Sequence, residues 1–418
     1  MTRRPLTILS VGHADSPQYR ERTARFVGLG HDVVELTGSK SVVSGARAII
    51  PRGVPAGRCW RLIGLSRIIH CLKTVRGLSP DLVFVHYAKG LWGWTAPLFG
   101  APVAVSVMGG DVLFDEQGTA NAWNRAATKG LLENAALVLC KSDYLAQRVR
   151  ALPVAGQVET HAWGIDTDVF SIGSGEEFRR EHAIPDDSPV VFSPRAMEPL
   201  YNTRLVVRAF AASGMAGEGA RLVLSTYKAD AAYRAEVERD CLDAGLGDSV
   251  IFLPPQDDRG MAGAFRAADV VVSVPSSDGL PQTFFESTAC GAPLVMADLP
   301  NYGHYFSHGR DVWLTPAESS AVARGIGAVC RDAELRRSLV RGARETMTRL
   351  SLGGGDQVLD QRLGQAAQGE TASLGAKVRQ SVRVLGALVT GEATARTGQP
   401  VCRTFGEYFR SLHAKAGW

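Results

Sequence analysis

Short apolar runs alternate with amphipathic segments along the first 160 or so residues. The runs lie at 6–11, 32–36, 82–86, 103–107 and 137–140. Several are apolar throughout, which is typical of strands that helices cover on both faces. This pattern predicts βαβ units and a doubly wound parallel sheet.

A second series of the same kind begins near residue 190. Its predicted strands lie at 190–192, 221–224, 250–253, 270–274 and 294–297. The stretch between the two series, 164–187, is polar and rich in glycine and charge, which favours a linker. We therefore expect an α/β chain with one domain at 1–163, an interdomain linker at 164–187 and a second domain at 188–350.

The chain changes character after residue 350. Residues 351–398 are rich in glycine, glutamine and alanine, and we expect a polar insertion that is mobile or loosely helical. Residues 399–418 regain helical periodicity, with Phe405, Tyr408, Phe409 and Leu412 on one face. We expect this C-terminal helix to pack back onto the body of the protein.

Length and composition fit a globular protein of two domains. The chain has 418 residues, of which 45% are hydrophobic and 21% charged, which excludes a disordered or fibrous protein. A net charge of +4 gives no reason to expect a nucleic-acid partner. The seven cysteines are scattered without metal-ligand spacing, and no apolar stretch suits a signal peptide or a membrane span. We expect a cytoplasmic protein without a metal site or cofactor.

One segment carries the clearest chemical signal. A predicted strand is followed by Asp278, Gly279, Leu280 and Pro281, and then by a helix that contains Glu286. Ligands bind at the carboxyl ends of such strands, and the free amides and dipole at a helix start favour an anion. This suits a diphosphate. The alternative is an ordinary loop with a helix cap and a solvated glutamate.

The same segment resembles glycosyltransferase family 4. The matching residues are Asp278, Gly279, Glu286 and the run 289–293, Ala-Cys-Gly-Ala-Pro, and the stretch 164–170 looks like the interdomain motif of that family. The resemblance implies a GT-B fold, in which two Rossmann-like domains face each other across a cleft. It also implies a retaining glycosyltransferase that uses a nucleotide diphosphate sugar, and we expect a donor of the UDP or GDP type. Because no acidic cluster with the character of Mg²⁺ ligands stands out in the sequence, we expect a metal-independent enzyme. The first domain would then be the acceptor side and the second the nucleotide-sugar domain.

The resemblance assigns roles to residues of the second domain. Glu286 would hold the donor ribose, while Asp278 and the amides of Gly279, Leu280 and Pro281 would hold the transferred sugar and the diphosphate. Arg195 matches the arginine that such enzymes direct at the diphosphate, and a guanidinium can bind phosphate through two N–H groups.

The sequence departs from the family pattern at one position of this domain. Tyr201 stands where the family usually has a lysine, and Arg204 or Lys228 are candidates for supplying the missing charge. For Arg204 the alternative is a solvated helix face.

The first domain also contains candidate site residues, and two of them have a structural alternative. His86 and Asp111 resemble acceptor-side residues at strand ends, and Asp111 joins Arg195 and Asp278 as a candidate catalytic residue. The alternatives are a buried structural histidine and a helix cap. Gly12 lies in the loop where the family often has paired glycines beside the phosphates.

The segment from Arg58 to Arg76 is basic and amphipathic. As a helix it could contact a membrane surface and serve a lipid-linked acceptor, or it could simply pack on the core with solvated arginines. The acceptor classes left open are a saccharide, a lipid-linked saccharide and a small molecule.

Two other functions remain open at this stage. A nucleotide-sugar epimerase shares the expected architecture, and a binding protein with a degraded site would explain Tyr201 and the aspartate at 278. A nicotinamide dehydrogenase is disfavoured, because no GxGxxG follows the first predicted strand.

Overall fold

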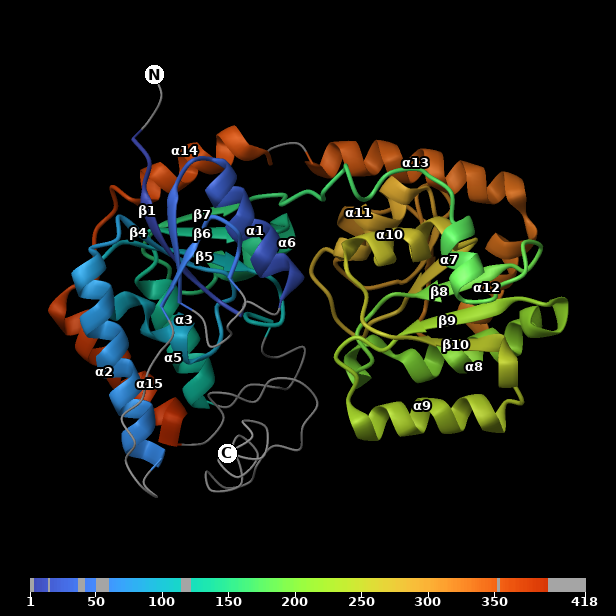
Figure 1. Cartoon of the computed structure of the whole chain (residues 1–418), viewed down its shortest axis with the longest axis horizontal. Helices are drawn as coiled ribbons and strands as arrows, with labels where there is room; N and C mark the ends of the chain where they lie inside the picture. The colour runs from blue at the N-terminus through green and yellow to red at the C-terminus, as the bar shows by residue number, and fades with distance from the viewer. Residues whose placement is uncertain are drawn as a thin grey trace. The chain divides into compact units, whose positions relative to one another are not determined.

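The computed structural model describes residues 4–13, 16–36, 42–49, 60–113, 122–351 and 354–389. These form two compact units. Unit 1 contains the described residues up to Trp163 and those from Gly354 onward, and unit 2 contains those from Gly164 to Ser351 (Figure 1). The predicted C-terminal helix at 399–418 lies outside the described residues.

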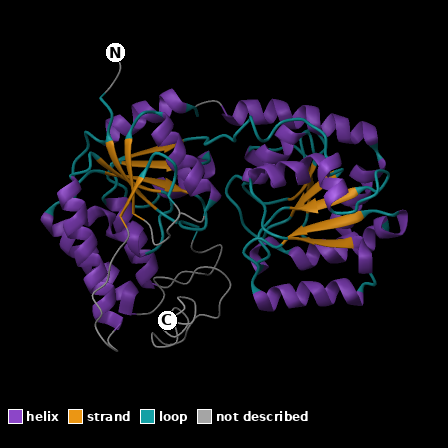
Figure 2. Cartoon of the chain, in the orientation of Figure 1, coloured by secondary structure: helices purple, strands orange, loops and turns teal. Residues whose placement is uncertain are grey.

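Unit 1 is built on a seven-stranded parallel sheet with helices around it (Figure 2). The strand order is β3-β2-β1-β4-β5-β6-β7, so the order reverses between β1 and β4. The strands are β1 (Thr7–Val11), β2 (Asp32–Leu36), β3 (Arg47–Ile49), β4 (Leu82–Val85), β5 (Val103–Val107), β6 (Leu137–Cys140) and β7 (Gln157–Thr160).

The helices of unit 1 cover both faces of this sheet. They are α1 (Pro17–Gly28), α2 (Trp60–Leu78), α3 (Leu91–Thr95), the 3-10 turn η1 (Ala96–Leu98), α5 (Ala122–Glu133) and α6 (Asp143–Arg150). Alternate residues of β4 enter two separate apolar clusters, Val83 and Val85 in one and Leu82 and Phe84 in the other. Burial on both faces explains why the central strands read as apolar throughout.

Helix α2 covers most of the predicted basic amphipathic segment. Of its described side chains, Ile68, Cys71 and Val75 are buried, while Ile69 is exposed. This burial is what the core-packing alternative predicts for that part of the segment.

Two further helices of unit 1 come from the region predicted as a polar insertion. They are α14 (Asp356–Ala366) and α15 (Leu374–Val389). Leu359 and Leu363, one turn apart, belong to the same apolar cluster as Phe26. On α15, the buried Gln380 donates to the carbonyls of Trp94 and Ala127, at 2.8 and 3.1 Å. The described part of the predicted insertion is therefore helical and packed, because a few buried side chains at helical spacing outweigh its polar composition.

Unit 2 repeats the architecture with a six-stranded parallel sheet. The strand order is β10-β9-β8-β11-β12-β13, and it reverses between β8 and β11. The strands are β8 (Val190–Ser193), β9 (Arg221–Ser225), β10 (Val250–Leu253), β11 (Val270–Ser273), β12 (Leu294–Ala297) and β13 (Trp313–Thr315).

Helices surround this second sheet as well. They are α7 (Glu176–Glu181), α8 (Thr203–Ser213), α9 (Ala231–Asp243), α10 (Asp258–Ala267), α11 (Gln282–Cys290), α12 (Ser319–Arg331) and α13 (Ala333–Ser351), with the 3-10 turns η2 (Pro199–Tyr201), η3 (Met215–Glu218), η4 (Gly247–Ser249) and η5 (Tyr302–His304). The predicted α/β class with two doubly wound domains is confirmed.

The predicted linker contains a helix and packs on unit 2. Helix α7 lies within it, and Arg179 of this helix donates to the carbonyls of Ala267 and Ser188, at 3.0 and 2.9 Å. Arg266 donates back to the carbonyls of Ser171 and Val169. Arg179 and Arg266 thus fix the predicted linker to α10. The polar composition of the linker did not predict this packing.

Candidate functional site

The point of strand-order reversal in unit 2 brings two of the predicted site residues together. The loops after β8 and β11 leave neighbouring strands at this reversal. In doubly wound sheets, ligands bind in the crevice at the carboxyl ends of such strands. Arg195 follows β8 and Asp278 follows β11. Their side chains form an ion pair with 2.9 Å between Nη2 and Oδ2, at only 14% and 9% exposure. The sequence predicted both residues, but not that they would pair.

Two tyrosines complete the surroundings of this ion pair. The guanidinium carbon of Arg195 lies 4.4 Å from the centre of the Tyr201 ring, so the ring covers one face of the cation. Tyr302 is fully buried, and its pKa is raised well above the ordinary value, by burial first and then by the charge of Asp278. Burial has the largest single effect and would lower the pKa of Arg195, but Asp278, Tyr201 and Tyr302 together raise this pKa above its ordinary value. Arg195 therefore stays charged.

Asn202 ties the two loops of the site to each other. It has a left-handed backbone with φ of 54°, which asparagine tolerates better than most residues. Its side-chain amide donates to the carbonyl of Val274 at 2.9 Å and to the Ser276 hydroxyl at 3.1 Å. The amide of Ser276 in turn donates to the carbonyl of Leu200 at 2.9 Å. Sequence analysis missed this residue, although an asparagine directly before a predicted helix was a usable signal.

The loop that begins with Asp278 is held by its own hydrogen bonds. The amide of Gly279 donates to Asp278 Oδ1 at 2.7 Å, and Asn301 donates to the carbonyls of Gly279 and Asp278 at 2.8 and 3.1 Å. The prediction that the amides of Gly279, Leu280 and Pro281 hold the ligand needs correction. Pro281 has no N–H, and the N–H of Gly279 is already bonded, so of these three only that of Leu280 remains.

Helix α11 supplies further donors directly after this loop. Pro281 is its N-cap residue rather than part of its first turn, and no side chain caps the helix start. The N–H groups of Gln282 and Thr283 form no hydrogen bond to another described residue. Glu286 lies half-buried in the second turn. The start of α11 thus offers backbone donors and a helix dipole to an anion.

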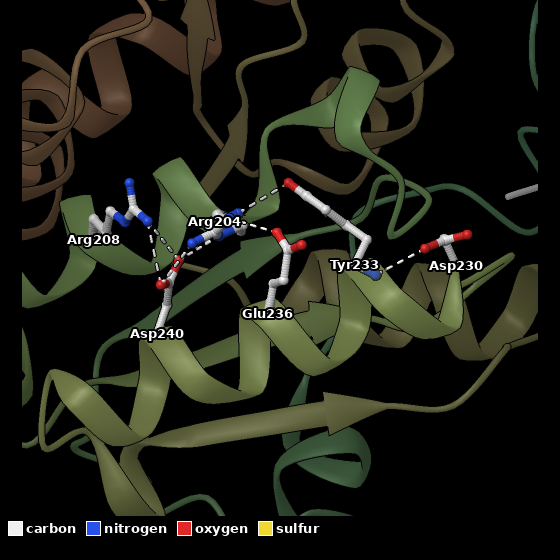
Figure 3. Close-up of polar contacts among 6 residues, drawn as sticks. All are labelled: Arg204, Arg208, Asp230, Tyr233, Glu236 and Asp240. Atoms are coloured by element: carbon white, nitrogen blue, oxygen red, sulfur yellow. Dashed lines mark hydrogen bonds and ion pairs between the residues drawn. The ribbon is translucent and has the colours of Figure 1, made fainter. Parts of the chain in front are cut away.

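Arg204 does not replace the positive charge of the lysine that the family usually has at the position of Tyr201. Its Nε and Nη1 atoms lie 2.7 and 2.5 Å from carboxylate oxygens of Asp240 and Glu236 on α9, as Figure 3 shows. This interaction neutralises Arg204. Lys228 has a left-handed backbone with φ of 48°, and its Nζ lies 4.6 Å from the centre of the Tyr227 ring. Among the described residues no carboxylate forms an ion pair with Lys228, so it remains a candidate.

A groove of about 490 Å³ lies beside the same helices. Arg204, Arg208, Asp230, Tyr233 and Glu236 line it, together with Pro199 and Asn202 from the loop after β8. Figure 3 shows Arg204 bound to Glu236, Arg208 directed at Asp240, and Asp230 accepting a hydrogen bond from the backbone amide of Tyr233. Because these charged groups already have partners, the strand ends with Arg195 and Asp278 are the better candidate site.

In unit 1, Gly12 and His86 follow β1 and β4, on either side of the strand-order reversal there. His86 is buried; its Nε2 lies 2.8 Å from the Ser10 hydroxyl, and its ring packs 4.6 Å from that of Tyr19. Burial and then the charge of Arg22 hold the His86 pKa well below its usual range, so the ring is neutral. A Cβ on Gly12 would lie 2.3 Å from the Tyr19 ring, so close packing requires glycine there.

Asp111 is wholly buried in unit 1. Its carboxylate accepts hydrogen bonds from the amides of Ala88 and Gly109 at 2.9 Å each, and from that of Met108 at 3.1 Å. Burial raises its pKa, and these hydrogen bonds partly offset the rise. Gly109, with φ of 126°, makes the turn that this carboxylate holds. These hydrogen bonds indicate that Asp111 stabilises the loop at Gly109. This role is closer to the predicted helix-cap alternative than to contact with a ligand.

The described part of the chain lacks both a metal-binding cluster and a membrane-spanning helix. It contains no group of three or more His, Cys, Asp or Glu side chains placed to hold a metal ion. None of its helices is long and apolar enough to cross a membrane.

The folds of known proteins agree with this architecture. The Anabaena protein HepE, in complex with UDP and glucose, superposes with a TM-score of 0.69 and 16% identity, covering 86% of this chain and 98% of that protein. Sucrose-phosphate synthase from Thermosynechococcus elongatus gives a TM-score of 0.70 and 20% identity, covering 86% and 97%. These similarities show a GT-B fold.

Sequence comparison identifies the family. Residues 174–346 match the family model for glycosyl transferases group 1, and residues 20–169 match that for glycosyltransferase family 4. The chain belongs to glycosyltransferase family 4. The D-inositol 3-phosphate glycosyltransferase of Saccharomonospora viridis is 29% identical over 218 residues, which are 50% of each chain. The match thus spans about half the length of such curated relatives.

Proposed function

We propose that this protein is a retaining glycosyltransferase that moves a sugar from a nucleotide diphosphate sugar to an acceptor hydroxyl. The observation that carries the proposal is the buried Arg195–Asp278 pair at the strand-order reversal of unit 2, next to the uncapped start of α11. A crevice at this position, with a cation and free backbone donors, suits a diphosphate ester.

Each residue of the crevice has a distinct task in this proposal. The guanidinium of Arg195 and the N–H groups of Leu280 and Gln282 bind the diphosphate. Asp278 accepts hydrogen bonds from hydroxyls of the transferred sugar. Glu286, one helical turn further along α11, accepts hydrogen bonds from the ribose. Similar structures hold UDP or UDP-glucose, which supports a donor of the UDP or GDP type.

The reaction needs stabilisation of the departing diphosphate above all. As the bond between the sugar and the β-phosphate breaks, negative charge develops on the phosphate and positive character on the sugar. Arg195 and the helix start stabilise the first of these charges. We propose that they suffice without a divalent ion. The acceptor attacks from the face that the phosphate leaves, and the phosphate takes the acceptor proton, so the anomeric configuration is retained.

For the acceptor we propose a chemical class rather than a particular compound. It carries a free hydroxyl on a saccharide, a lipid-linked saccharide or a small molecule, and unit 1 binds it. The curated relatives are named for inositol 3-phosphate, which supports the small-molecule class. In unit 1 the buried Asp111 shapes the loop at Gly109, and we propose that it acts by positioning this loop.

A thermal-shift titration tests the donor site. The purified protein, in EDTA, is titrated with UDP-, GDP-, ADP- and TDP-sugars, because a ligand that binds only the folded state raises its melting temperature. We expect one nucleotide class to stabilise the wild type. Arg195→Ala and Glu286→Ala should lose this shift. Arg204→Ala is the matched control and should keep it, because Arg204 is bound to Asp240 and Glu236.

Two results would contradict the proposal. One is the absence of any shift across the whole panel. The other is a shift that survives in Arg195→Ala, since the diphosphate would then bind elsewhere.

A further inference from the structure

Helix α15 has an apolar stripe on its solvent side. Its inner side is fixed to unit 1 through the buried Gln380, Val384 and Ala387. The stripe is formed by four apolar side chains, with exposed fractions of 80, 57, 55 and 46%: Leu374, Val378, Val382 and Leu385. Their spacing of four, four and three residues places them along one face of the helix.

An aromatic side chain of a neighbouring helix contacts α15 near one end of the stripe. A Cβ on Gly386 would lie 2.1 Å from the Trp123 ring, so this ring packs directly against α15 next to Leu385. Trp123 is itself 40% exposed. Tryptophan suits a position that is apolar on one side and wet on the other.

The charges on α15 are all positive. The helix contains no Asp or Glu. Arg383 is bound to Glu133 of α5, at 2.5 Å. Lys377 and Arg379, which flank Val378 in the sequence, form no ion pair with any described residue. The stripe is therefore bordered by cations without counter-charges in the described part of the chain.

We propose that the α15 stripe docks unit 1 on an anionic membrane surface. An apolar stripe bordered by basic residues is what an interfacial helix requires, because the apolar side chains enter the acyl boundary and the cations meet lipid phosphates. A second copy of this chain fits less well, since a symmetric contact would bring Lys377 and Arg379 of both copies together. This surface lies on a different helix from the basic segment at 58–76, and its function does not depend on sugar transfer.

Vesicle co-sedimentation of the full chain tests this surface. The vesicles contain phosphatidylglycerol and phosphatidylcholine in equal parts, or phosphatidylcholine alone. We expect binding to the anionic vesicles that is weakened by salt, and binding at least about tenfold weaker to the neutral ones.

Two pairs of substitutions separate the apolar and the charged contributions. Val378→Asp with Val382→Asp, and separately Lys377→Glu with Arg379→Glu, should each weaken binding to the anionic vesicles at least about tenfold. Leu242→Asp is the matched control: this residue is 76% exposed on α9 of unit 2, and binding should not change.

Three results would overturn the proposal. The first is wild-type protein that does not sediment with anionic vesicles. The second is binding that neither pair of substitutions weakens. The third is a dimer, seen by sedimentation velocity, that Val378→Asp with Val382→Asp dissociates, since the stripe would then be an interface between copies. Equal melting temperatures of the variants and the wild type confirm that the stripe is not part of the folded core.

Discussion

At the residue scale, the contact of Tyr201 with Arg195 decides how the candidate cation is presented. The ring covers one face of the guanidinium and Asp278 takes one edge, which leaves other in-plane N–H groups for a phosphate. The turn that carries Tyr201 is itself held by Asn202. Tyrosine at this position thus orients a cation, although it adds no charge of its own.

This geometry predicts a graded response to substitution of Tyr201. Tyr201→Phe keeps the ring and should bind the donor nucleotide within about threefold of wild type, whereas Tyr201→Leu should bind it about 5- to 30-fold more weakly. Calorimetric titration measures both. In an Arg195→Ala background, Tyr201→Leu should have no further effect, because the contact is already lost. An equal loss in both backgrounds would mean that Tyr201 acts independently of Arg195.

A second prediction at this scale concerns acid stability. Burial, followed by the charge of Arg362, lowers the pKa of His161 from 6.5 to about 3. In the unfolded chain, His161 therefore binds a proton below about pH 6.5. In the folded chain it binds this proton only below about pH 3. The stability that this histidine contributes is present above pH 6.5 and is lost as the pH falls between these values, by about 2 kcal/mol at pH 5.

Urea unfolding of a variant at two pH values checks this linkage. His161→Gln cannot titrate and still offers an acceptor to Arg362, which lies 3.0 Å from His161 Nδ1. Between pH 8 and pH 5 the variant should lose about 2 kcal/mol less of its unfolding free energy than the wild type. Equal losses would show that His161 does not titrate as its burial implies.

At the scale of elements, the hydrophobic pattern predicted the central strands and the edge strand β10 closely, and it missed the other three edge strands of the described sheets. Strands β2, β5, β6, β10 and β12 have the bounds that the sequence predicts. The missed strands β3, β7 and β13 are three or four residues long, and most of their residues are partly or fully exposed. An edge strand has one neighbour and little apolar cover, so its pattern resembles that of a loop.

Packing between elements predicts opposite effects for two glycines in helices. A Cβ on Gly342 of α13 would lie 2.1 Å from the carbonyl oxygen of Arg310, whereas one on Gly77 of α2 would meet nothing within 4 Å. Gly342→Ala should reduce the unfolding free energy by about 1–3 kcal/mol. Gly77→Ala, its control, should be neutral or stabilising by up to about 1 kcal/mol. Thermal unfolding of the two variants compares them, and a neutral Gly342→Ala would mean that α13 moves freely against this loop.

At the scale of the whole molecule, the sequence predicted two doubly wound domains but not which unit the later helices join. The first division falls at Trp163, where the sequence changes from apolar runs to polar residues. Helices α14 and α15 pack on unit 1 through contacts more than 200 residues apart in the chain, such as that of Gln380 with Trp94. Local composition carries no signal for such contacts.

For the candidate site, the sequence named residues but not their geometry. Arg195, Asp278 and Glu286 followed from motif and strand ends. Their pairing, the orientation of Arg195 by Tyr201 and the burial of Asp111 depend on distances between loops that no local pattern encodes. The fold was therefore easier to predict than the role of each polar residue within it.

The central claim is that unit 2 breaks the bond between a sugar and a nucleoside diphosphate with the help of Arg195. The most direct test is the release of nucleoside diphosphate from the stabilising donor, measured in EDTA with a panel of acceptors. We predict acceptor-dependent release by the wild type and by Arg204→Ala, and a kcat at least about 100-fold lower in Arg195→Ala. Binding of the donor without any release would contradict the claim and favour a binding protein with a degraded site, and so would equal turnover by Arg195→Ala.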